Sequence, residues 1–426
     1  MAPRLTSRTI ELRRVVITGM GTLNAVGNDV ATSWNALLKG VSGIGPIDRF
    51  DASDLAVTFA GQIKGFDATT VFEKKEVRRL DPFLHYAMAA AIEAIEGSGL
   101  QIDPALSHRY GVMFGTGIAG LGWMYTNHVA LATKGPSKVS PFFVPGSIAN
   151  MASGLISIRY GLRGPNTCVV TACTTGTHAI GDAYRIVQRG EADAMVAGGS
   201  EAPVTPPGVV GFINMKALSR RNDDPQHASR PFDRGRDGFV MAEGAGAMVL
   251  ESLEHALARG APILGEIVGY GMSGDAHHMT APHEEGIGAQ LAMRNAIADA
   301  QIQPTDIDYI NAHGTSTPYN DRIETYAIKQ VFGEHAYKLA VSSTKSMTGH
   351  ALGGAGGMEA IFTAMALREG KLPPTINQFE SDPDCDLDYV PNEMREASLR
   401  VALSNSFGFG GTNGCLALAR YEEEAP

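Results

Sequence analysis

The stretch CVVTACTTGTHAIG, residues 168–181, determines the expected fold, because an apolar run passes through a turn of small residues into a helix. The run 168–172 predicts a buried strand. The i, i+3, i+4, i+7 spacing of a helix packed on a sheet follows at Ile180, Ala183, Tyr184 and Val187. The stretch AVSSTKSMTGHALG, residues 340–353, repeats this order of strand, turn and helix. The sequence therefore predicts an α/β protein in which one unit occurs twice.

Further segments recur in the same order on both sides of Gly260. The matching pairs are strands 14–21 and 266–271, helices 87–95 and 291–300, strands 110–114 and 308–312, and strands 193–199 and 401–407. Recurrence of this kind predicts a duplication, with a leader at 1–14, an N-terminal half at 15–260 and a C-terminal half at 261–426. If the halves pack about a pseudo-twofold axis, corresponding loops converge and Cys173 lies near His313, His350 and Phe409. The proline-rich stretch 200–240 interrupts the alternation and predicts surface loops.

The composition is that of an ordinary globular protein, with 44% hydrophobic and 19% charged residues. No apolar run approaches the roughly 18 residues of a membrane span. The net charge of -10 gives no electrostatic footprint for nucleic acid. The four cysteines lack C-x-x-C spacing, which argues against a disulfide framework or a zinc site and favours a reducing, cytoplasmic location.

Two motifs suggest other chemistries and fail their tests. The segment GTGIAG, residues 115–120, matches a dinucleotide fingerprint after a strand, but no Asp or Glu lies between Asp103 and Asp182 to hold a ribose. His277, His278 and His283 have no cysteine or carboxylate at a recognisable ligand spacing. A tight turn and a polar loop are therefore favoured over a nicotinamide site and a metal site.

The strand-to-helix turn places Cys173 at a helix N-terminus, where the helix dipole stabilises a thiolate. The sequence therefore predicts a lowered pKa for this thiol and a nucleophile that needs no base beside it. Small residues follow the cysteine and leave its sulfur approachable, namely Thr174, Thr175 and Gly176. Cys168, Cys385 and Cys415 are interpreted as buried and inert.

Two histidines lie at turns of the C-terminal half, His313 in NAHGTST (311–317) and His350 in TKSMTGH (344–350). Neutral imidazoles can hydrogen-bond an enolate oxygen, and Lys345 adds fixed positive charge near a developing anion. The glycines of GFGGTNG, residues 408–414, free backbone N–H groups, while Phe409 offers one bulky gate. The N–H groups of Cys173 and Phe409 are predicted to form an oxyanion hole for a thioester carbonyl.

In these motifs, residues 14–421 resemble the elongating β-ketoacyl-acyl-carrier-protein synthases of the second type, which have the thiolase-like fold of duplicated α-β-α-β-α layered halves. The resemblance implies a decarboxylative Claisen condensation of an acyl chain held on Cys173 with malonyl-acyl-carrier protein. The products are 3-oxoacyl-acyl-carrier protein and CO2, in fatty acid chain elongation, and His313 and His350 stabilise the enolate. Initiating synthases of the third type carry Asn in place of the second His, and thiolases carry a second catalytic Cys.

The same resemblance implies further site residues. Thr315 and Thr317 hydrogen-bond the pantetheine arm, Phe409 gates the acyl pocket, and Ile118 belongs to the pocket wall. A supporting polar network around Lys345 comprises Asp321, Glu324 and Glu359. The sequence departs from the family's pattern in the bulk of Thr174 and Thr175 and in Tyr319 and Asn320, which replace a glycine-containing pair. These departures concern chain-length preference more than reaction type.

The implied partner is an acidic acyl carrier protein that brings its own phosphopantetheine, so no resident cofactor is expected, and a bound monovalent cation is left open. The family also implies a homodimer. Candidate docking residues are the basic side chains Lys74, Lys75, Arg78, Arg79, Lys216, Arg220 and Arg221. Two alternatives stay open. One is a type II polyketide-type ketosynthase with the same catalytic residues, and the other is a non-catalytic scaffold subunit, which the complete catalytic set disfavours.

Overall fold

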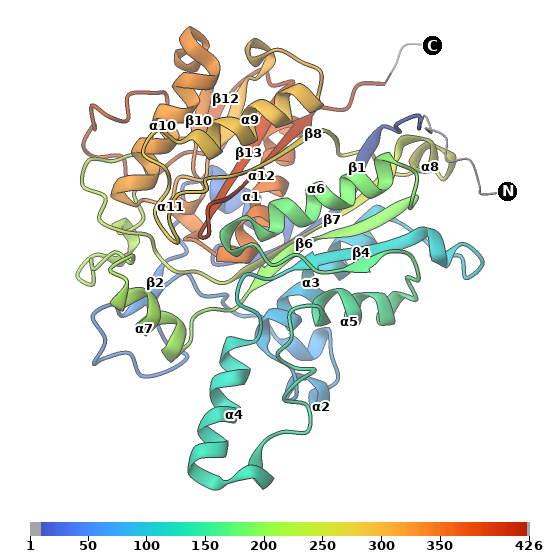
Figure 1. The fold of residues 1–426 in the computed structure, drawn as a ribbon, viewed down its shortest axis with the longest axis vertical. Helices are drawn as coiled ribbons and strands as arrows, with labels where there is room; N and C mark the ends of the chain where they lie inside the picture. The colour runs from blue at the N-terminus through green and yellow to red at the C-terminus, as the bar shows by residue number, and fades with distance from the viewer. Residues whose placement is uncertain (1–9, 424–426) are drawn as a thin grey trace, which may run out of the picture.

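Ten strands form the central sheet of the protein in the order β10-β9-β13-β14-β8-β1-β7-β6-β4-β5 (Figure 1). The computed structural model describes residues 10–423, so most of the predicted leader 1–14 lies outside the described residues. The N-terminal strands are β1 (Val15–Asn24), β4 (Tyr110–Gly115), β5 (Asn166–Thr167), β6 (Ala194–Glu201) and β7 (Gly244–Ser252). The C-terminal strands are β8 (Gly265–Gly274), β9 (Tyr309–Asn311), β10 (Ala340–Ser342), β13 (Val401–Gly408) and β14 (Thr412–Ala419).

The two sets of five strands have the same internal order. β4 pairs in parallel with β5 and β6, as β9 does with β10 and β13. β7 is antiparallel to β6 and β1, as β14 is to β13 and β8. The halves join where the start of β1 runs antiparallel to the start of β8. The duplication predicted from the sequence is thereby confirmed, and Gly260 lies just before β8.

The helices form three layers around the two half-sheets (Figure 1). α6 (Thr175–Gln188) and α12 (Ala355–Glu369) contact each other and strands of both halves, so they form the middle layer. α3 (Pro82–Ser98) and α5 (Met151–Tyr160) cover the first half-sheet, while α9 (Ile287–Asp299) covers the second together with α10 (Pro318–Phe332), which packs beside α9 in the same apolar cluster. The predicted thiolase-like α/β layering is confirmed. Among the described residues, no helix combines the length and apolar character that crossing a membrane requires.

The remaining helices and strands lie outside these layers, and all of them except α4 are shorter than ten residues. They are α1 (Val30–Leu38), α2 (Lys74–Val77), α4 (Leu121–Lys134), α7 (Pro206–Asn214), α8 (Leu253–Ala258), α11 (Lys345–Thr348), β2 (Gly45–Pro46), β3 (Phe59–Ala60), β11 (Lys371–Leu372) and β12 (Arg395–Glu396). The predicted surface loops at 200–240 thus include α7, and several side chains of this stretch are buried, among them Phe232 and Phe239.

The middle layer depends on glycines at the contact between α6 and α12. A Cβ added to Gly176 would lie 2.4 Å from the backbone nitrogen of Gly357, a distance that real side chains do not reach. Every residue of α12 from Ala355 to Leu367 is buried. Close helix packing of this kind explains part of the high glycine content.

The turn before Cys173 differs from the predicted strand 168–172. β5 ends at Thr167, residues 168–171 have no regular structure, and a 3-10 turn spans Ala172–Thr174. The hydroxyl of Thr175 accepts from the Thr171 N–H and donates to the Ala172 carbonyl, which closes the turn and ends the extended run. Ala172 has φ 50°, and Leu352, at the corresponding position before α12, has φ 45°. Both halves therefore use the same left-handed turn to start their middle helix.

We expect Gly176→Ala to lower the free energy of unfolding by about 1–3 kcal/mol, because α12 must move away from the added methyl group. The matched control is Gly97→Ala in α3, where an added Cβ meets no atom within 4 Å. This control should leave stability unchanged or raise it by up to about 1 kcal/mol, since alanine is the better helix former. Urea denaturation measures both variants, and equal effects would contradict the packing argument.

Candidate active site

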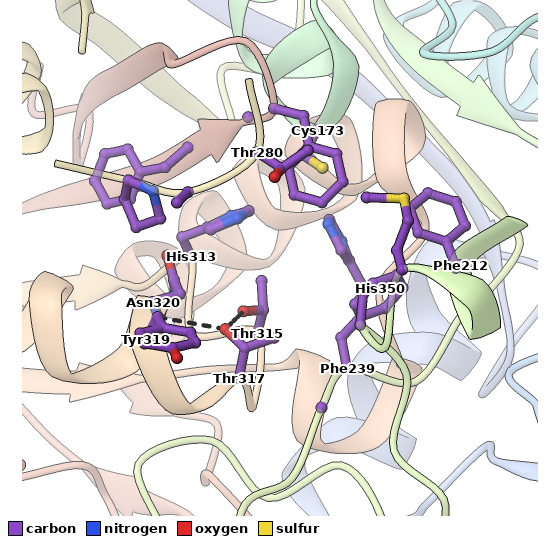
Figure 2. Close-up of a pocket in the computed structure, with 18 of the residues that line it drawn as sticks. Cys173, Phe212, Phe239, Thr280, His313, Thr315, Thr317, Tyr319, Asn320 and His350 are labelled. Atoms are coloured by element: carbon purple, nitrogen blue, oxygen red, sulfur yellow. Dashed lines mark hydrogen bonds between the residues drawn. The ribbon is translucent and has the colours of Figure 1, made fainter. Parts of the chain in front are cut away.

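A cavity of about 350 Å³ lies where loops of the two halves converge. Cys173 comes from the N-terminal half, and His313, His350 and Phe409 come from the C-terminal half. Figure 2 shows the two imidazoles on either side of the space next to Cys173, with Thr315 further from the sulfur. The convergence expected from the duplicated turns is confirmed.

Cys173 lies in the turn that leads into α6 and is only 7% exposed. Its burial raises the pKa of the thiol to about 12, although the charge of Lys345 and the backbone N–H groups of Phe409 and of Cys173 itself lower it. The predicted lowering of this pKa is therefore wrong, because desolvation outweighs the favourable dipoles. Both N–H groups thus interact with the sulfur, and their role as an oxyanion hole for a thioester carbonyl stays a prediction.

His313 and His350 are buried side by side, with ring centroids 5.4 Å apart and planes at 86°. Burial and the charge of Lys345 hold the pKa of each imidazole well below its usual value, and for His313 the neighbouring His350 adds to the shift. Within residues 10–423, Nδ1 of His313 and both ring nitrogens of His350 have no hydrogen-bond partner. The pair is therefore neutral near pH 7, with nitrogens available to a ligand.

The acidic residues predicted around Lys345 have separate contacts. Lys345 is 1% exposed and hydrogen-bonds Glu359. Glu324 accepts the N–H groups of His313 and Gly314 at 2.8 and 2.7 Å. Asp321 accepts the N–H of Ser316 at 3.1 Å and that of Phe232 at 2.9 Å. Glu359 is thus the partner of Lys345, whereas Glu324 and Asp321 fix the backbone of the His313 loop.

The two departures from the family's pattern have structural explanations. Thr174 donates its hydroxyl to the Thr412 carbonyl at 2.7 Å and so ties the Cys173 turn to the glycine loop that carries Phe409. Tyr319 lines the cavity and is 68% exposed, so it stands at the mouth. Further inside, the hydroxyls of Thr315 and Thr317 are 3.1 Å apart (Figure 2).

Comparison with known families identifies both halves of the chain. Residues 12–256 match the family described as Beta-ketoacyl synthase, N-terminal domain, and residues 264–379 match Beta-ketoacyl synthase, C-terminal domain. The chain belongs to the β-ketoacyl synthase family. It is therefore a condensing acyltransferase, and the thiolase-like resemblance is confirmed.

Two bacterial relatives of the enzyme carry the name 3-oxoacyl-[acyl-carrier-protein] synthase 2. The Coxiella burnetii relative is 54% identical over 411 residues, covering 96% of this chain and 99% of that protein. The Synechocystis relative is 55% identical over 413 residues, covering 97% and 99%. A β-ketoacyl synthase from Burkholderia phymatum has a similar structure, with TM-score 0.89, 34% identity and coverage of 96% and 100%. A type II polyketide ketosynthase in complex with its acyl-carrier protein matches with the same TM-score, identity and coverage.

Ile118 and most of the predicted docking residues do not line the cavity of the enzyme. Ile118 packs in an apolar cluster that includes Cys173 and Leu352. Of the docking candidates, only Lys216 is at the mouth, where its φ is 57°. The four candidates in and beside α2 lie elsewhere, with Lys75 paired to Glu73 and Arg79 over the Phe142 ring. Lys74 is exposed.

Sequence reasoning missed an aromatic row beside the nucleophile. The ring centroid of Phe212, in α7, lies 6.3 Å from that of Phe409 and 5.3 Å from that of Phe239. Phe239 in turn packs edge-on against His350, with ring centroids 5.5 Å apart. Phe212 and Phe239 lie in the stretch predicted as surface loops. The interrupted alternation there gave no periodic signal, although aromatic residues in a proline-rich stretch could have indicated burial.

Several buried oxygens near the His313 loop have no partner among residues 10–423, namely Asn311 Oδ1, Glu359 Oε2, Ser404 Oγ and Asn405 Oδ1. Asn311 and Ser404 face each other in register on β9 and β13. Amide, hydroxyl and carboxylate oxygens are the donors that hard cations prefer. The donor types therefore fit a hard cation, and the monovalent ion left open by the sequence would meet oxygens of this kind here.

Alkylation of Cys173 by iodoacetamide should become faster with each pH unit up to about pH 10, because the thiolate form is reactive and the raised pKa keeps it scarce at pH 7. The rate is measured by intact-protein mass, and the Cys173→Ala variant corrects for reaction at the other cysteines. A plateau near pH 8 would contradict the burial effect.

Proposed function

We propose that the enzyme condenses an acyl chain held on Cys173 with malonyl-acyl-carrier protein, giving 3-oxoacyl-acyl-carrier protein and CO2 in fatty acid chain elongation. The observation that carries this proposal is one cavity in which Cys173 meets two neutral histidines and the loop that carries Phe409. A nucleophile, proton carriers and an oxyanion site are the parts that acyl transfer requires.

In the first step, the Cys173 sulfur attacks the thioester carbonyl of the acyl carrier protein. The oxyanion accepts hydrogen bonds from the N–H groups of Cys173 and Phe409. Because the thiol pKa is raised, a neutral imidazole takes the Cys173 proton and delivers it to the departing pantetheine sulfur. The carbon–sulfur bond to pantetheine breaks and the acyl chain remains on Cys173.

In the second step, the malonyl thioester loses CO2, and the electron pair of the broken carbon–carbon bond forms an enolate. His313 and His350 donate hydrogen bonds to the enolate oxygen. The enolate carbon attacks the Cys173 thioester, a carbon–carbon bond forms, and the sulfur leaves as a thiolate, which takes a proton from solvent to restore the thiol. The charge of Lys345 favours this arrangement because it opposes protonation of both imidazoles and stabilises the departing thiolate.

Thr315 and Thr317 are proposed to bind the pantetheine arm, since their hydroxyls line the cavity that leads to Cys173. The identity of 54–55% to proteins named 3-oxoacyl-[acyl-carrier-protein] synthase 2 favours fatty acid elongation over polyketide assembly, where the solved ketosynthase noted above is 34% identical. The acyl carrier protein partner is supported by that ketosynthase complex.

A homodimer is proposed from the segment that contains α4. Figure 1 shows this segment projecting from the layered body. It exposes large apolar side chains, namely Tyr125, Val129, Leu131, Val144 and Ile148. Exposed apolar clusters of this kind mark contact surfaces. Sedimentation should give about twice the chain mass of 45.0 kDa; a monomer would contradict the proposal.

A cytoplasmic location is proposed from the four free cysteines.

The enzyme is tested by mixing wild type and Cys173→Ala with palmitoyl-acyl-carrier protein and measuring intact-protein mass. Wild type alone should gain the acyl group and, after malonyl-acyl-carrier protein is added, release a 3-oxoacyl product. Failure of wild type to take any acyl chain would contradict the assignment and favour the scaffold alternative. Transfer without condensation would leave an acyltransferase of another kind.

Lys216→Glu should raise KM for carrier-bound substrate at least about threefold, because a reversed charge at the mouth repels an acidic carrier protein. Small thioester substrates should be unaffected. Lys75→Glu tests in the same assay whether the basic surface of α2, which Lys74 and the neighbouring Arg79 share, takes part in docking. Steady-state kinetics with both substrate forms measures the effect, and equal changes for carrier-bound and small substrates would contradict docking.

A further inference from the structure

Glu201 ends β6 and is completely buried, although it bears a carboxylate. Four donors point at it. Its Oε1 accepts from the Thr116 hydroxyl at 2.7 Å and from the Ile118 N–H at 3.1 Å. Its Oε2 accepts from the N–H groups of Gly117 at 2.6 Å and Gly353 at 3.0 Å. One carboxylate therefore joins a loop of the N-terminal half to the turn before α12 in the C-terminal half.

The two segments that Glu201 joins lie directly against the nucleophile turn. A Cβ on Gly117 would be 3.2 Å from the Ala172 carbonyl and 3.3 Å from the Gly353 nitrogen. Ile118 and Leu352, which follow and precede these glycines, pack with Cys173 in one apolar cluster. Glu201 thus fixes the backbone at Gly117 and Ile118 on one side of the Cys173 sulfur and at Gly353 on the other.

This packing bears on where an acyl chain can go. Leu352 lines the cavity beside Cys173, whereas Ile118 does not line it. An acyl chain that extends from the sulfur past Leu352 into this apolar cluster enters packing to which Ile118 contributes. The Glu201 carboxylate accepts the backbone N–H groups of Gly117 and Ile118, and these hydrogen bonds resist displacement of Ile118 by the acyl chain.

We propose that Glu201 is a positioning residue that holds the loop Thr116–Ile118 against Gly353 and so limits how far Ile118 yields to a long acyl chain. The inference rests on the proposed acyl transfer to Cys173. It assigns to Glu201 a part in acyl chain-length selectivity, without contact between its carboxylate and the substrate.

The substitution Glu201→Gln tests the proposal because three of the four donors are backbone N–H groups. An amide NH2 in place of either oxygen faces at least one of these N–H groups, so the clamp loosens while the side chain keeps its size. Thr116→Val removes one donor and leaves the carboxylate in place. The matched control is Glu93→Gln, since the Glu93 carboxylate accepts the N–H groups of Thr22 and Val30 and lies outside the cavity lining.

Rate constants for acylation of Cys173 by octanoyl- and hexadecanoyl-acyl-carrier protein are measured by intact-protein mass. The assay is run at pH 8, above the pKa of about 7 to which burial raises Glu201. The hexadecanoyl-to-octanoyl ratio should rise about fivefold in Glu201→Gln and about twofold in Thr116→Val, as loss of hydrogen bonds to a charged group predicts. It should not change in Glu93→Gln. Iodoacetamide enters through the cavity, so its rate should stay within about twofold in all variants.

An unchanged or lower ratio in Glu201→Gln would overturn the inference while leaving the proposed function intact. If that variant does not fold, as shown by circular dichroism, the ratio in Thr116→Val decides in the same way. Loss of iodoacetamide reactivity together with both acyl rates would show general disruption and would also overturn it. Wild type that accepts neither acyl chain would overturn the proposed function and this inference with it.

Discussion

The close contact between α6 and α12 is the constraint on which the site depends. Two helices can approach this closely only where glycines face each other, as Gly176 and Gly357 do. Each helix begins at a turn that leaves its own half-sheet, so the contact brings the two turns together. Cys173 precedes one helix and His350 lies close before the other, and residues 177 positions apart in sequence line the same cavity. Catalytic geometry here is a consequence of helix packing.

Charge in the site comes from one buried cation. Lys345 is paired with Glu359, yet its charge still contributes to the low pKa of both histidines. At Cys173 the same charge only partly offsets the rise in pKa that burial causes. Desolvation acts in the same direction on the imidazoles and in the opposite direction on the thiol. The site therefore holds neutral histidines beside a protonated cysteine, and proton transfer from the thiol becomes part of the acylation step.

Much of the fold and of the site could be predicted from the sequence because short segments indicate the strands, turns and helices that build both. The repeated strand, turn and helix order identified the duplication, and the convergence of Cys173 with His313 and His350 followed from it. The strand assigned to 168–172 was wrong because the Thr175 hydroxyl closes a turn there, which no periodicity reveals. Phe212 and Phe239 were missed for a similar reason, and the thiol pKa depended on burial that only the packed structure defines.

The left-handed residues Ala172 and Leu352 mark equivalent positions in the two halves, yet the molecule has one reactive sulfur at these turns. By their place in the turn, Cys173 in one half corresponds to Gly353 in the other. A side chain at 353 would begin 2.3 Å from the Gly117 nitrogen, so the second turn has no room for a nucleophile. The two turns offer two equivalent positions, and only the first of them carries a thiol. Because close packing at Gly353 leaves no space for a second thiol, the molecule has one asymmetric reaction centre. The C-terminal half contributes histidines to this centre and no competing sulfur.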